Sequence, residues 1–413
     1  MAENSPVQGI VWQEFRPVNQ YTPNSKVMFD ISASPNLYYD LKRSTLRVKS
    51  KILKDDGSVP NSKTKDKDGN ALTVDNVAPT NFLLHSLWSQ LEIALQQKTI
   101  TKIGDNHAHK AYIDALLSTS ATQKNTGMMS QMFVKDTPGT LDETTPNGSN
   151  EGLFQRYSYT KDGQSVFMEG PLYDDLAEQD RYVLNGVPIS ISLWPNSSAF
   201  SLMADKEGYK VVVEDVAVNM CCVEVDPGML QAHNRMLKDS PALYPLEMSD
   251  IKTHNVPQGQ QSLIVNDVYQ GKVPDQLVVG MVSSEAYSGS YKKSPWNFQH
   301  FNLTSAGFYV DGKSVPSSPI ETNFESGDVV QGYGSLLNLR QDLGITLAEY
   351  QKGYTLLAYN LKSGLITHGP QKGSTRLELK FARPLPEAVT VIVYAKFPTV
   401  VEIDQARAVR VQA

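Results

Sequence analysis

Apolar and polar residues alternate over many short stretches of this chain, which is the pattern of half-buried β-strands. Between Arg43 and Leu53, the apolar residues Leu46, Val48 and Ile52 alternate with basic residues. One face of this stretch is therefore apolar and the other charged, which predicts a strand with one face in a core and the other in solvent. The 23 prolines and 27 glycines are spread along the chain, as expected for many short strands joined by turns.

Two runs are apolar on both faces, at residues 208–224 and from Val389 to Tyr394. Strands of this kind lie at the centre of a sheet. We interpret the first run as one central strand or as two strands that share a bend. Similar patterns predict the other strands, which are 26–32, 91–95, 152–159, 165–169, 181–194, 242–253, 261–269, 276–284, 354–361, 374–381 and 388–396.

A few segments follow the helical period instead. One apolar face is formed by Ala108, Ala111, Tyr112, Ala115 and Leu116. A second is formed by Val329, Tyr333, Leu336 and Leu337. Residues 228–237 are predicted to form a short linker helix that Pro241 ends, and Thr346 with Glu349 is predicted to make a capping box for one further turn.

One stretch occurs twice. It reads PTNFLLHSLWSQLEIALQQKTI from Pro79 and PWNFQHFNLTSAGFYVDGKSV from Pro295, and a gap of one residue aligns Lys98 with Lys313. A strand, a turn, a helical pattern and further strands follow each copy in the same order, and each half ends on Val-Glu-x-Asp, at residues 223–226 and 401–404. Chance similarity between two strand–turn segments is the alternative, but the repeated order favours two similar domains in tandem. We interpret Asn81 and Asn297 of the two copies as turn formers that start a strand.

The strand count of each half fits a β-sandwich, and eight strands in two Greek keys make a jelly roll. An immunoglobulin-type sandwich is disfavoured because its Cys…Trp…Cys spacing is absent. The sequence therefore predicts an all-β protein of two tandem eight-stranded jelly rolls with short inserted helices. The predicted parts are an N-terminal arm (1–25), a first jelly roll (26–226), a linker helix (227–237), a second jelly roll (238–398) and a C-terminal tail (399–413).

The polar loops 54–76 and 118–151 are predicted to form an exposed crown at one end of the molecule. The arm and the tail are predicted to be free to tie neighbouring molecules together. Three copies of a tandem jelly roll around a threefold axis would make a ring with six similar edges, and such a ring can tile a hexagonal lattice.

The 413-residue chain carries 38 basic and 44 acidic residues, a net charge of -6, which argues against a dedicated nucleic-acid binder. No apolar run is long enough to span a bilayer, and the first residues show no signal-peptide pattern. The two cysteines, Cys221 and Cys222, are neighbours and are expected to be buried thiols in a strand.

Candidate chemistry is sparse. Asp174 and Asp175 are adjacent carboxylates, which on a strand would point to opposite sides and so could not act as a glycosidase pair. His107 and His109 are two residues apart on a predicted helix, so we expect surface histidines rather than metal ligands. We find no ligand pattern among the seven histidines His85, His107, His109, His233, His254, His300 and His368. No P-loop, zinc or Gly-x-Ser-x-Gly motif appears, so we predict no enzyme and assign no catalytic, cofactor-binding or metal-binding residues.

A second class of function is open. Tyr287, Tyr291 and Trp296 lie in a turn-rich segment, where exposed aromatic rings could bind glycans as in a lectin or an attachment protein. The alternative is that these rings pack under loops.

Four stretches carry a family resemblance: NFLLHSLWSQLEIALQQKTI, YVLNGVPISISLWP, GYTLLAYNL and VTVIVYAKFPTVVEID. With them the chain resembles, from Tyr38 to Asp404, the hexon-like double jelly-roll major capsid protein of Polinton (Maverick) elements and adintoviruses. The resemblance implies a homotrimeric, pseudo-hexameric capsomer of an icosahedral shell around double-stranded DNA. It implies neighbouring capsomers, vertex (penton) proteins and minor capsid proteins as partners, a location in the virion, and no catalytic residues. A minor or vertex capsid protein is the related alternative, which the length of the chain disfavours.

Overall fold

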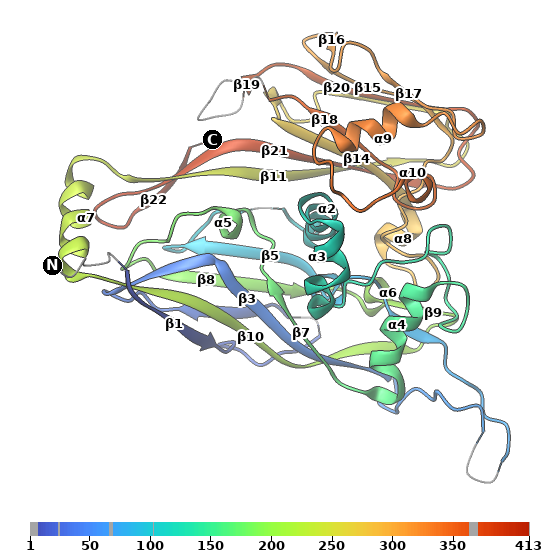
Figure 1. Cartoon of the computed structure of the whole chain (residues 1–413), viewed down its shortest axis with the longest axis horizontal. Coiled ribbons are helices and arrows are strands. Elements are labelled where there is room, and N and C mark those ends of the chain that lie inside the picture. The colour runs from blue at the N-terminus through green and yellow to red at the C-terminus, as the bar shows by residue number, and fades with distance from the viewer. Residues whose placement is uncertain (1–6, 24, 66–68, 102, 363–370, 413) are drawn as a thin grey trace.

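The computed structural model describes residues 7–23, 25–65, 69–101, 103–362 and 371–412. The molecule is elongated, and its two halves lie one above the other with most long strands running along the long axis (Figure 1). Helix α7 (Pro227–Asp239) stands at one end and connects the two halves. Asp226 caps it by accepting a hydrogen bond from the Gly228 amide at 2.8 Å, which explains why the helix begins where the preceding strand ends.

The first half is a sandwich of two four-stranded sheets with the strand orders β1-β10-β3-β7 and β2-β8-β5-β6. The bounds are β1 Val7–Phe15, β2 Val27–Ile31, β3 Leu37–Lys54, β5 Trp88–Leu95, β6 Lys98–Thr99, β7 Val166–Pro171, β8 Ile189–Pro195 and β10 Tyr209–Val225. The run that is apolar on both faces is the single strand β10, which lies between β1 and β3 as an interior strand.

The second half repeats this arrangement with the orders β11-β21-β14-β18 and β12-β20-β15-β16. The bounds are β11 Ala242–Val256, β12 Ser262–Asn266, β14 Gln276–Ser283, β15 Leu303–Val310, β16 Lys313–Ser314, β18 Leu356–Asn360, β20 Thr375–Phe381 and β21 Val389–Ile403. In each half the first, eighth, third and sixth strands make one sheet, and the second, seventh, fourth and fifth make the other. Each half is an eight-stranded jelly roll, as predicted.

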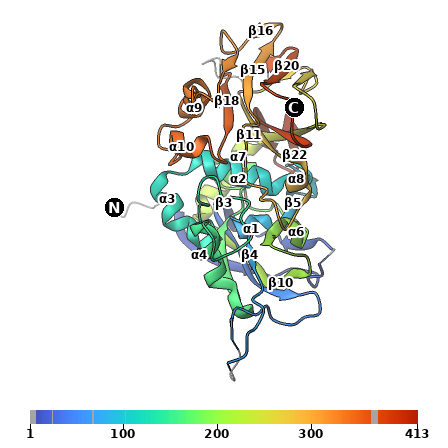
Figure 2. The same cartoon turned by 90° about the vertical axis from the view of Figure 1, so that its right-hand side faces the viewer.

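Smaller elements complete the fold. The short strands are β4 Val77–Pro79, β9 Leu202–Ala204, β13 Lys272–Val273, β17 Ile320–Glu321, β19 Gln371–Lys372 and β22 Val409–Gln412. The other helices are α1 Leu83–Ser86, α2 His107–Ser118, α3 Ala121–Asn125, α4 Glu151–Thr160, α5 Asp175–Glu178, α6 Ser198–Ser201, α8 Ser284–Ser288, α9 Val330–Leu337 and α10 Leu347–Tyr350, with 3-10 turns at Gly127–Gln131 and Lys161–Gly163. Viewed along the strands, α3, α4, α9 and α10 lie on one side of the molecule, and α6 and α8 lie on the other (Figure 2).

The repeated sequence stretch forms the hairpin of the fourth and fifth strands in both halves. Lys98 begins β6 and Lys313 begins β16, so the sequence alignment matches equivalent positions. The two-residue turns also match, because Gln96 and Gln97 have φ of 50° and 64° and Asp311 and Gly312 have 49° and 78°. A two-residue turn with positive φ at both positions has a backbone twist that matches the twist of the two flanking strands.

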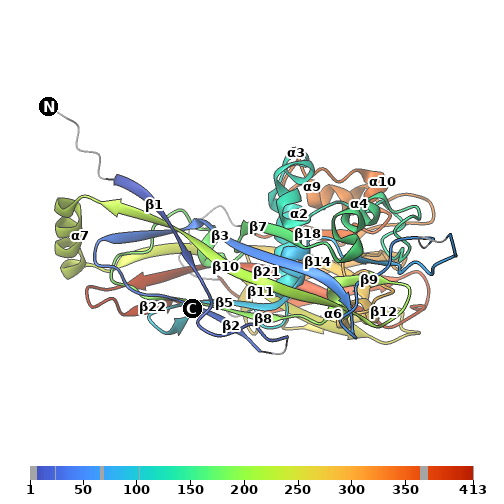
Figure 3. The same cartoon turned by 90° about the horizontal axis from the view of Figure 1, so that it is seen from below.

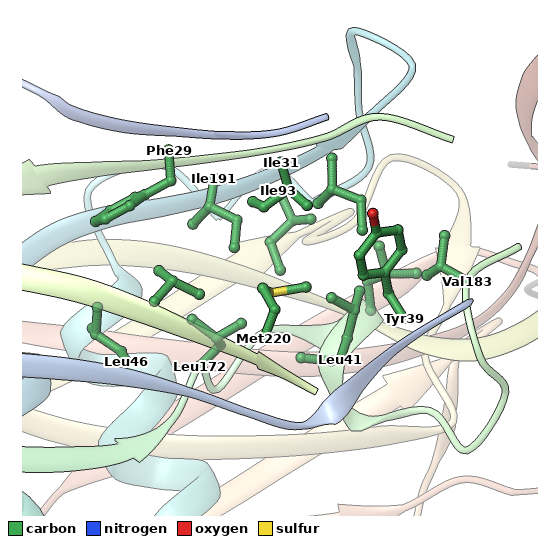
Figure 4. Packing of buried hydrophobic residues seen from close by; sticks show 14 of the residues in the cluster. Phe29, Ile31, Tyr39, Leu41, Leu46, Ile93, Leu172, Val183, Ile191 and Met220 are labelled. Carbon is green, nitrogen blue, oxygen red and sulfur yellow. The ribbon is translucent and has the colours of Figure 1, made fainter. Parts of the chain in front are cut away.

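Each sandwich has its own core. In the first, Phe29, Ile93 and Ile191 of one sheet face Leu46 and Met220 of the other, and all five side chains are buried (Figure 4). In the second, inward-facing residues of β14 and β21 pack against β15 and β20. The alternation seen in the sequence is what lets each strand place one row of side chains in these cores.

The predicted arm and tail need correction. Within 1–25, β1 pairs with β10 along Val7–Phe15 as the first strand of the first jelly roll, and it crosses the sheet seen from below (Figure 3). Within 399–413, β21 continues to Ile403 and β22 folds back onto it. These parts are therefore not free over the residues described, because their apolar side chains pack against the first core. Residues 1–6, 24 and 413 of the arm and tail lie outside the described residues.

One predicted strand is wrong. Residues 152–159 belong to helix α4, which Asn150 caps by accepting from the Leu153 amide at 3.2 Å. A Cβ atom at Gly152 would lie 2.3 Å from the Lys135 carbonyl oxygen, so only glycine allows this helix to approach the loop. The aromatic residues of the segment suggested a strand, but burial by tertiary contacts outweighed this local propensity. The strand predicted at 181–194 is shorter than expected and begins only at Ile189.

Candidate assembly interface

Helix α2 joins the two jelly rolls. It belongs to the connection between β6 and β7 of the first half, and its residues from His107 to Leu116 are all buried. Its predicted apolar face is confirmed, but the opposite face is buried as well. One cluster of buried residues contains the α2 side chains together with Ile251, Val278, Ile392 and Tyr394, which lie in strands of the second half. A helix buried on all sides therefore fills the space between the halves.

Aromatic rings form the centre of this contact. Trp296, from the segment before β15, stacks on Tyr112 of α2 with ring centroids 4.3 Å apart and an angle of 14° between the planes. Its indole nitrogen donates to the carbonyl oxygen of Asn81 in the first half at 2.8 Å. Phe298 stacks on Tyr112 from further away, at 6.2 Å. The second copy of the repeated stretch thus packs directly against the first.

The two repeated asparagines do not act as predicted. The Asn81 side chain accepts a hydrogen bond from the Val134 amide at 2.8 Å, and the Asn297 side chain donates to Asp142 at 2.8 Å. Both partners lie in the segment 118–151, far away in sequence. The asparagines therefore anchor this segment instead of starting a strand through local hydrogen bonds.

The segment 118–151, which is predicted to be an exposed crown loop, contacts both halves of the chain, while most of residues 122–130 are exposed. Lys124 donates to the carbonyl oxygens of Leu116 at 2.7 Å and of Leu343, in the second half, at 2.6 Å. Lys135 forms an ion pair with Glu349 at 2.7 Å. The loop 54–76 does project away from the body of the molecule, as Figure 1 shows for the part that is described. Residues 66–68 of that predicted loop lie outside the described residues.

A buried network of charges lies beside the aromatic centre. The Lys110 ammonium, which has no exposed surface, is 2.8 Å from Asp114, 3.1 Å from Asp175 and 3.1 Å from Glu178. Lys396 of β21 reaches Asp114 at 3.3 Å. The network thus joins α2 and α5 of the first half to a strand of the second.

Hydroxyl groups complete the network from the second half. Tyr394 donates to Asp114 at 2.6 Å. Ser249 of β11 donates to Asp175 at 2.8 Å through its hydroxyl, and its amide donates to the same carboxylate at 2.6 Å. Buried charges are stable only when they are paired and hydrogen-bonded, so these contacts hold the halves in one relative position.

The pKa values follow from burial and pairing. Burial alone would lower the pKa of Lys110, but Asp114, Asp175 and Glu178 outweigh it and raise this pKa well above the ordinary value. The same competition raises the pKa of Lys396, chiefly through Asp114. Burial favours a raised pKa for Asp114, but Lys110 and Lys396 lower it. These three groups are therefore charged at neutral pH.

The adjacent carboxylates Asp174 and Asp175 lie at the start of helix α5, not on a strand as predicted. Asp174 caps the helix by accepting from the Leu176 amide at 2.9 Å and also accepts from the Thr101 hydroxyl at 2.6 Å. Its burial, together with the neighbouring charge of Asp175, raises its pKa to about 7. Each of the two carboxylates therefore has buried partners of its own, Thr101 for Asp174 and Ser249 and Lys110 for Asp175.

The expectation of surface histidines on α2 is wrong. His107 and His109 are buried, and Nε2 of His107 lies 3.2 Å from Nδ1 of His85. Burial lowers the pKa of His85 and of His109 to about 3, and that of His107 well below its ordinary value. His368 lies outside the described residues. Among the residues described, no group of three or more His, Cys, Asp or Glu side chains could hold a metal ion.

The aromatic residues that suggested glycan binding pack under loops. Trp296 is fully buried, the Tyr287 hydroxyl donates to Asn106 at 2.7 Å, and the Tyr291 hydroxyl donates to the Tyr209 carbonyl oxygen at 2.6 Å. The observation that favoured a lectin is therefore removed. Cys221 and Cys222 are buried free thiols in β10, as expected.

Sequence reasoning missed the buried ion pairs of Lys110, Asp114 and Lys396. A lysine and an aspartate four residues apart on one helix normally mark a solvated face.

The chain was compared with protein families and with known sequences. No family model matches the chain. An uncharacterised protein of Caenorhabditis elegans is 24% identical over 427 residues, which cover 97% of this chain and 96% of that protein. Within the part of the chain that the structure describes, no helix is long and apolar enough to cross a membrane.

Several solved structures have a similar fold over nearly the whole chain. A chain of the Sputnik virophage has a TM-score of 0.66 at 12% identity and covers 99% of this chain and 89% of its own. The Faustovirus major capsid protein has a TM-score of 0.58 at 10% identity (95% and 90%), and the mavirus major capsid protein has 0.53 at 12% identity (100% and 93%). The chain has the double jelly-roll fold of viral major capsid proteins.

Proposed function

We propose that this chain is a major capsid protein. It assembles as a homotrimer with a pseudo-sixfold outline, and the trimers tile an icosahedral shell around double-stranded DNA. The observation that carries this proposal is the pair of complete jelly rolls with identical strand order, fixed against each other by α2 and the Lys110 network. A rigid block with two equivalent halves is what a threefold ring with six similar edges requires.

The proposal extends to partners and location. Neighbouring trimers, vertex (penton) proteins and minor capsid proteins are its partners, and the virion is its location after assembly in the nucleus or cytoplasm of the host cell. The resemblance in sequence from Tyr38 to Asp404 supports an assignment to the capsids of Polinton elements and adintoviruses. The network around Lys110 supports a structural role without catalysis, because its charged groups bind one another across the interface.

The experiment is a measurement of molar mass for the purified chain by light scattering after size exclusion, followed by negative-stain imaging. We expect three times the chain mass of 45.7 kDa and particles with a pseudo-sixfold outline. Salt screens contacts between charged surfaces, so the salt concentration is varied during assembly. We expect shells at some of these concentrations. A chain that stays monomeric at every salt concentration contradicts the proposal.

A further inference from the structure

A cleft of about 540 Å³ lies in the second half, where three connections between strands meet. It is lined by residues from the segment 297–302 before β15, from 351–353 after α10 and from 383–387 between β20 and β21. Gly139 of the first half also lines it. This volume is within the range of about 300–1,000 Å³ that is usual for sites that bind small molecules.

The cleft lies toward the end of the molecule that is opposite to α7. Helix α10, which ends just before Gln351, lies toward that end in Figure 1. The loop 54–76 projects from the same end, over the part that the structure describes. The cleft therefore shares its end of the molecule with a projecting loop of the predicted crown.

Hydrogen bonds within the protein hold the walls of the cleft in place. The Gly139 amide donates to the Lys352 carbonyl oxygen at 2.9 Å, and the Ala382 amide donates to the Asn302 carbonyl oxygen at 2.9 Å. The Asn302 amide in turn donates to Nδ1 of His300 at 2.9 Å. A site whose walls are already fixed loses little freedom when a ligand binds, so such a cleft is prepared for binding.

Three side-chain amides of the cleft lack partners. Gln299, Asn302 and Gln351 are half-buried, and across the described residues their side chains form no hydrogen bond with the protein. Polar groups that are withdrawn from solvent need partners, which here can come only from water or a ligand. Each amide places a donor beside an acceptor, and sugar hydroxyl groups, which both donate and accept, match this arrangement.

The charged side chains of the cleft present mainly positive charge to a ligand. Lys352 has no carboxylate within ion-pair distance in the described part of the chain. Arg383 pairs with Glu325 at 2.6 Å, but these side chains are 70% and 54% exposed, so water competes with their pairing. The carboxylate of Glu387 is already paired with Lys293.

We propose that this cleft binds a sugar residue that carries one carboxylate. Lys352 and Arg383 bind the carboxylate, and the three free amides bind the hydroxyl groups. Phe301, Pro384 and Pro386 offer apolar surface to the C–H groups of the sugar ring. The site goes beyond the proposed capsid function, because binding needs only the folded chain. In an assembled shell, it attaches the particle to acidic glycans.

The experiment is a titration of the purified full-length chain, followed by saturation-transfer NMR, with three methyl glycosides. Those of N-acetylneuraminic acid and glucuronic acid carry a carboxylate, and that of glucose is neutral. We expect at least one acidic sugar to bind at least about tenfold more tightly than the glucoside, because a hydrogen bond to a charged group contributes this much. The acidic sugar that binds more tightly identifies the source of the carboxylate.

Four variants locate the site. Lys352→Gln and Arg383→Gln are each expected to weaken binding of the acidic sugar about tenfold and to leave binding of the glucoside unchanged. Asn302→Gly removes an amide at a position with φ of 53°, which glycine adopts without strain, and is expected to weaken binding of both kinds of sugar. Lys238→Gln on α7 is the control at the opposite end, and it should bind like the unaltered chain. Circular-dichroism melting curves verify that each variant is folded.

Three results would overturn this proposal. They are acidic sugars that bind no more tightly than the glucoside, Lys352→Gln and Arg383→Gln variants that bind like the unaltered chain, and a Lys238→Gln variant that loses as much affinity as they do. The outcome is separate from that of the capsid proposal. A chain that binds the acidic sugar but stays monomeric contradicts only the capsid assignment, and a trimer that binds no sugar contradicts only the site.

Discussion

The indole ring of Trp296 lies nearly parallel to the phenol ring of Tyr112, with their centroids 4.3 Å apart. The two residues come from different jelly rolls, and each ring is fully buried. Because the indole nitrogen also donates to Asn81, Trp296 contacts the first half through both its face and its edge. This one side chain therefore contributes to holding the halves together.

Replacing Trp296 with alanine is expected to lower the free energy of unfolding by ~3–5 kcal/mol, as for other large side chains removed from a core. The measurement is urea-induced unfolding followed by circular dichroism. Trp12→Ala is the matched control, because Trp12 is 54% exposed, and its effect should lie within roughly 0.5 kcal/mol of zero. Equal effects of the two substitutions would show that the interface does not depend on the stacked pair.

Replacing Lys110 with methionine leaves Asp114, Asp175 and Glu178 without their central cation in a buried site. Breaking a buried ion pair on one side costs about 3–5 kcal/mol, so we expect a loss of that size in urea unfolding. Lys42→Met is the control, since Lys42 pairs with Asp180 at the surface and such pairs contribute about 0–1 kcal/mol. A neutral Lys110→Met variant would show that the network is dispensable.

Burial of neutral His109 makes the free energy of unfolding decrease as the solution becomes acidic. Burial lowers its pKa to about 3 in the folded chain, whereas an unfolded histidine has the ordinary value of 6.5. The unfolded chain therefore binds more protons between these values, so the stability contributed by neutral His109 is lost as the pH falls through this window. We expect His109→Phe to lose less stability than the unaltered chain between pH 6.5 and pH 4, measured as the thermal midpoint. Phenylalanine suits the site because Phe200, Tyr287 and Trp296 surround the ring.

Asp174 has the opposite effect, because its contribution to the free energy of unfolding decreases as the pH rises. Burial raises its pKa to about 7 from 3.8, so the folded chain binds the extra proton and this group stabilises the fold below its unfolded pKa. That contribution is lost as the pH rises through about 7. Asp174→Asn keeps a side chain that can cap α5, so it should gain stability relative to the unaltered chain at pH 8 more than at pH 5, measured by urea unfolding. Asp180→Asn, at an exposed position, should show no such difference between the two pH values.

Much of the fold could be predicted because its signals are local. The alternation of apolar and polar residues in β3 predicts a half-buried strand, and the apolar run of β10 predicts a central strand. The repeated stretch identified equivalent hairpins because the turns at Gln96 and at Asp311 need the same backbone conformation in both halves. The helical period of α2 gave its position within the first half.

The failures have a common cause. The aromatic residues of α4 have strand propensity, but Asn150 and the close contact at Gly152 decide that the segment is a helix. The sequence predicts a free arm at β1 because its partner β10 lies some 200 residues further along the chain. A pattern within a short segment carries no record of the distant segment that packs against it.

The sequence by itself determined that this chain has two similar β-domains, because side-chain periodicity and turn chemistry depend on neighbouring residues alone. Only the tertiary structure decided how the domains are joined. His109 and Lys110 are ordinary polar residues of a helix until Tyr287 and Tyr394 of the second half cover them and remove water. Burial of a charge depends on every surface around it, so the interface that fixes the two jelly rolls exists only once both have folded.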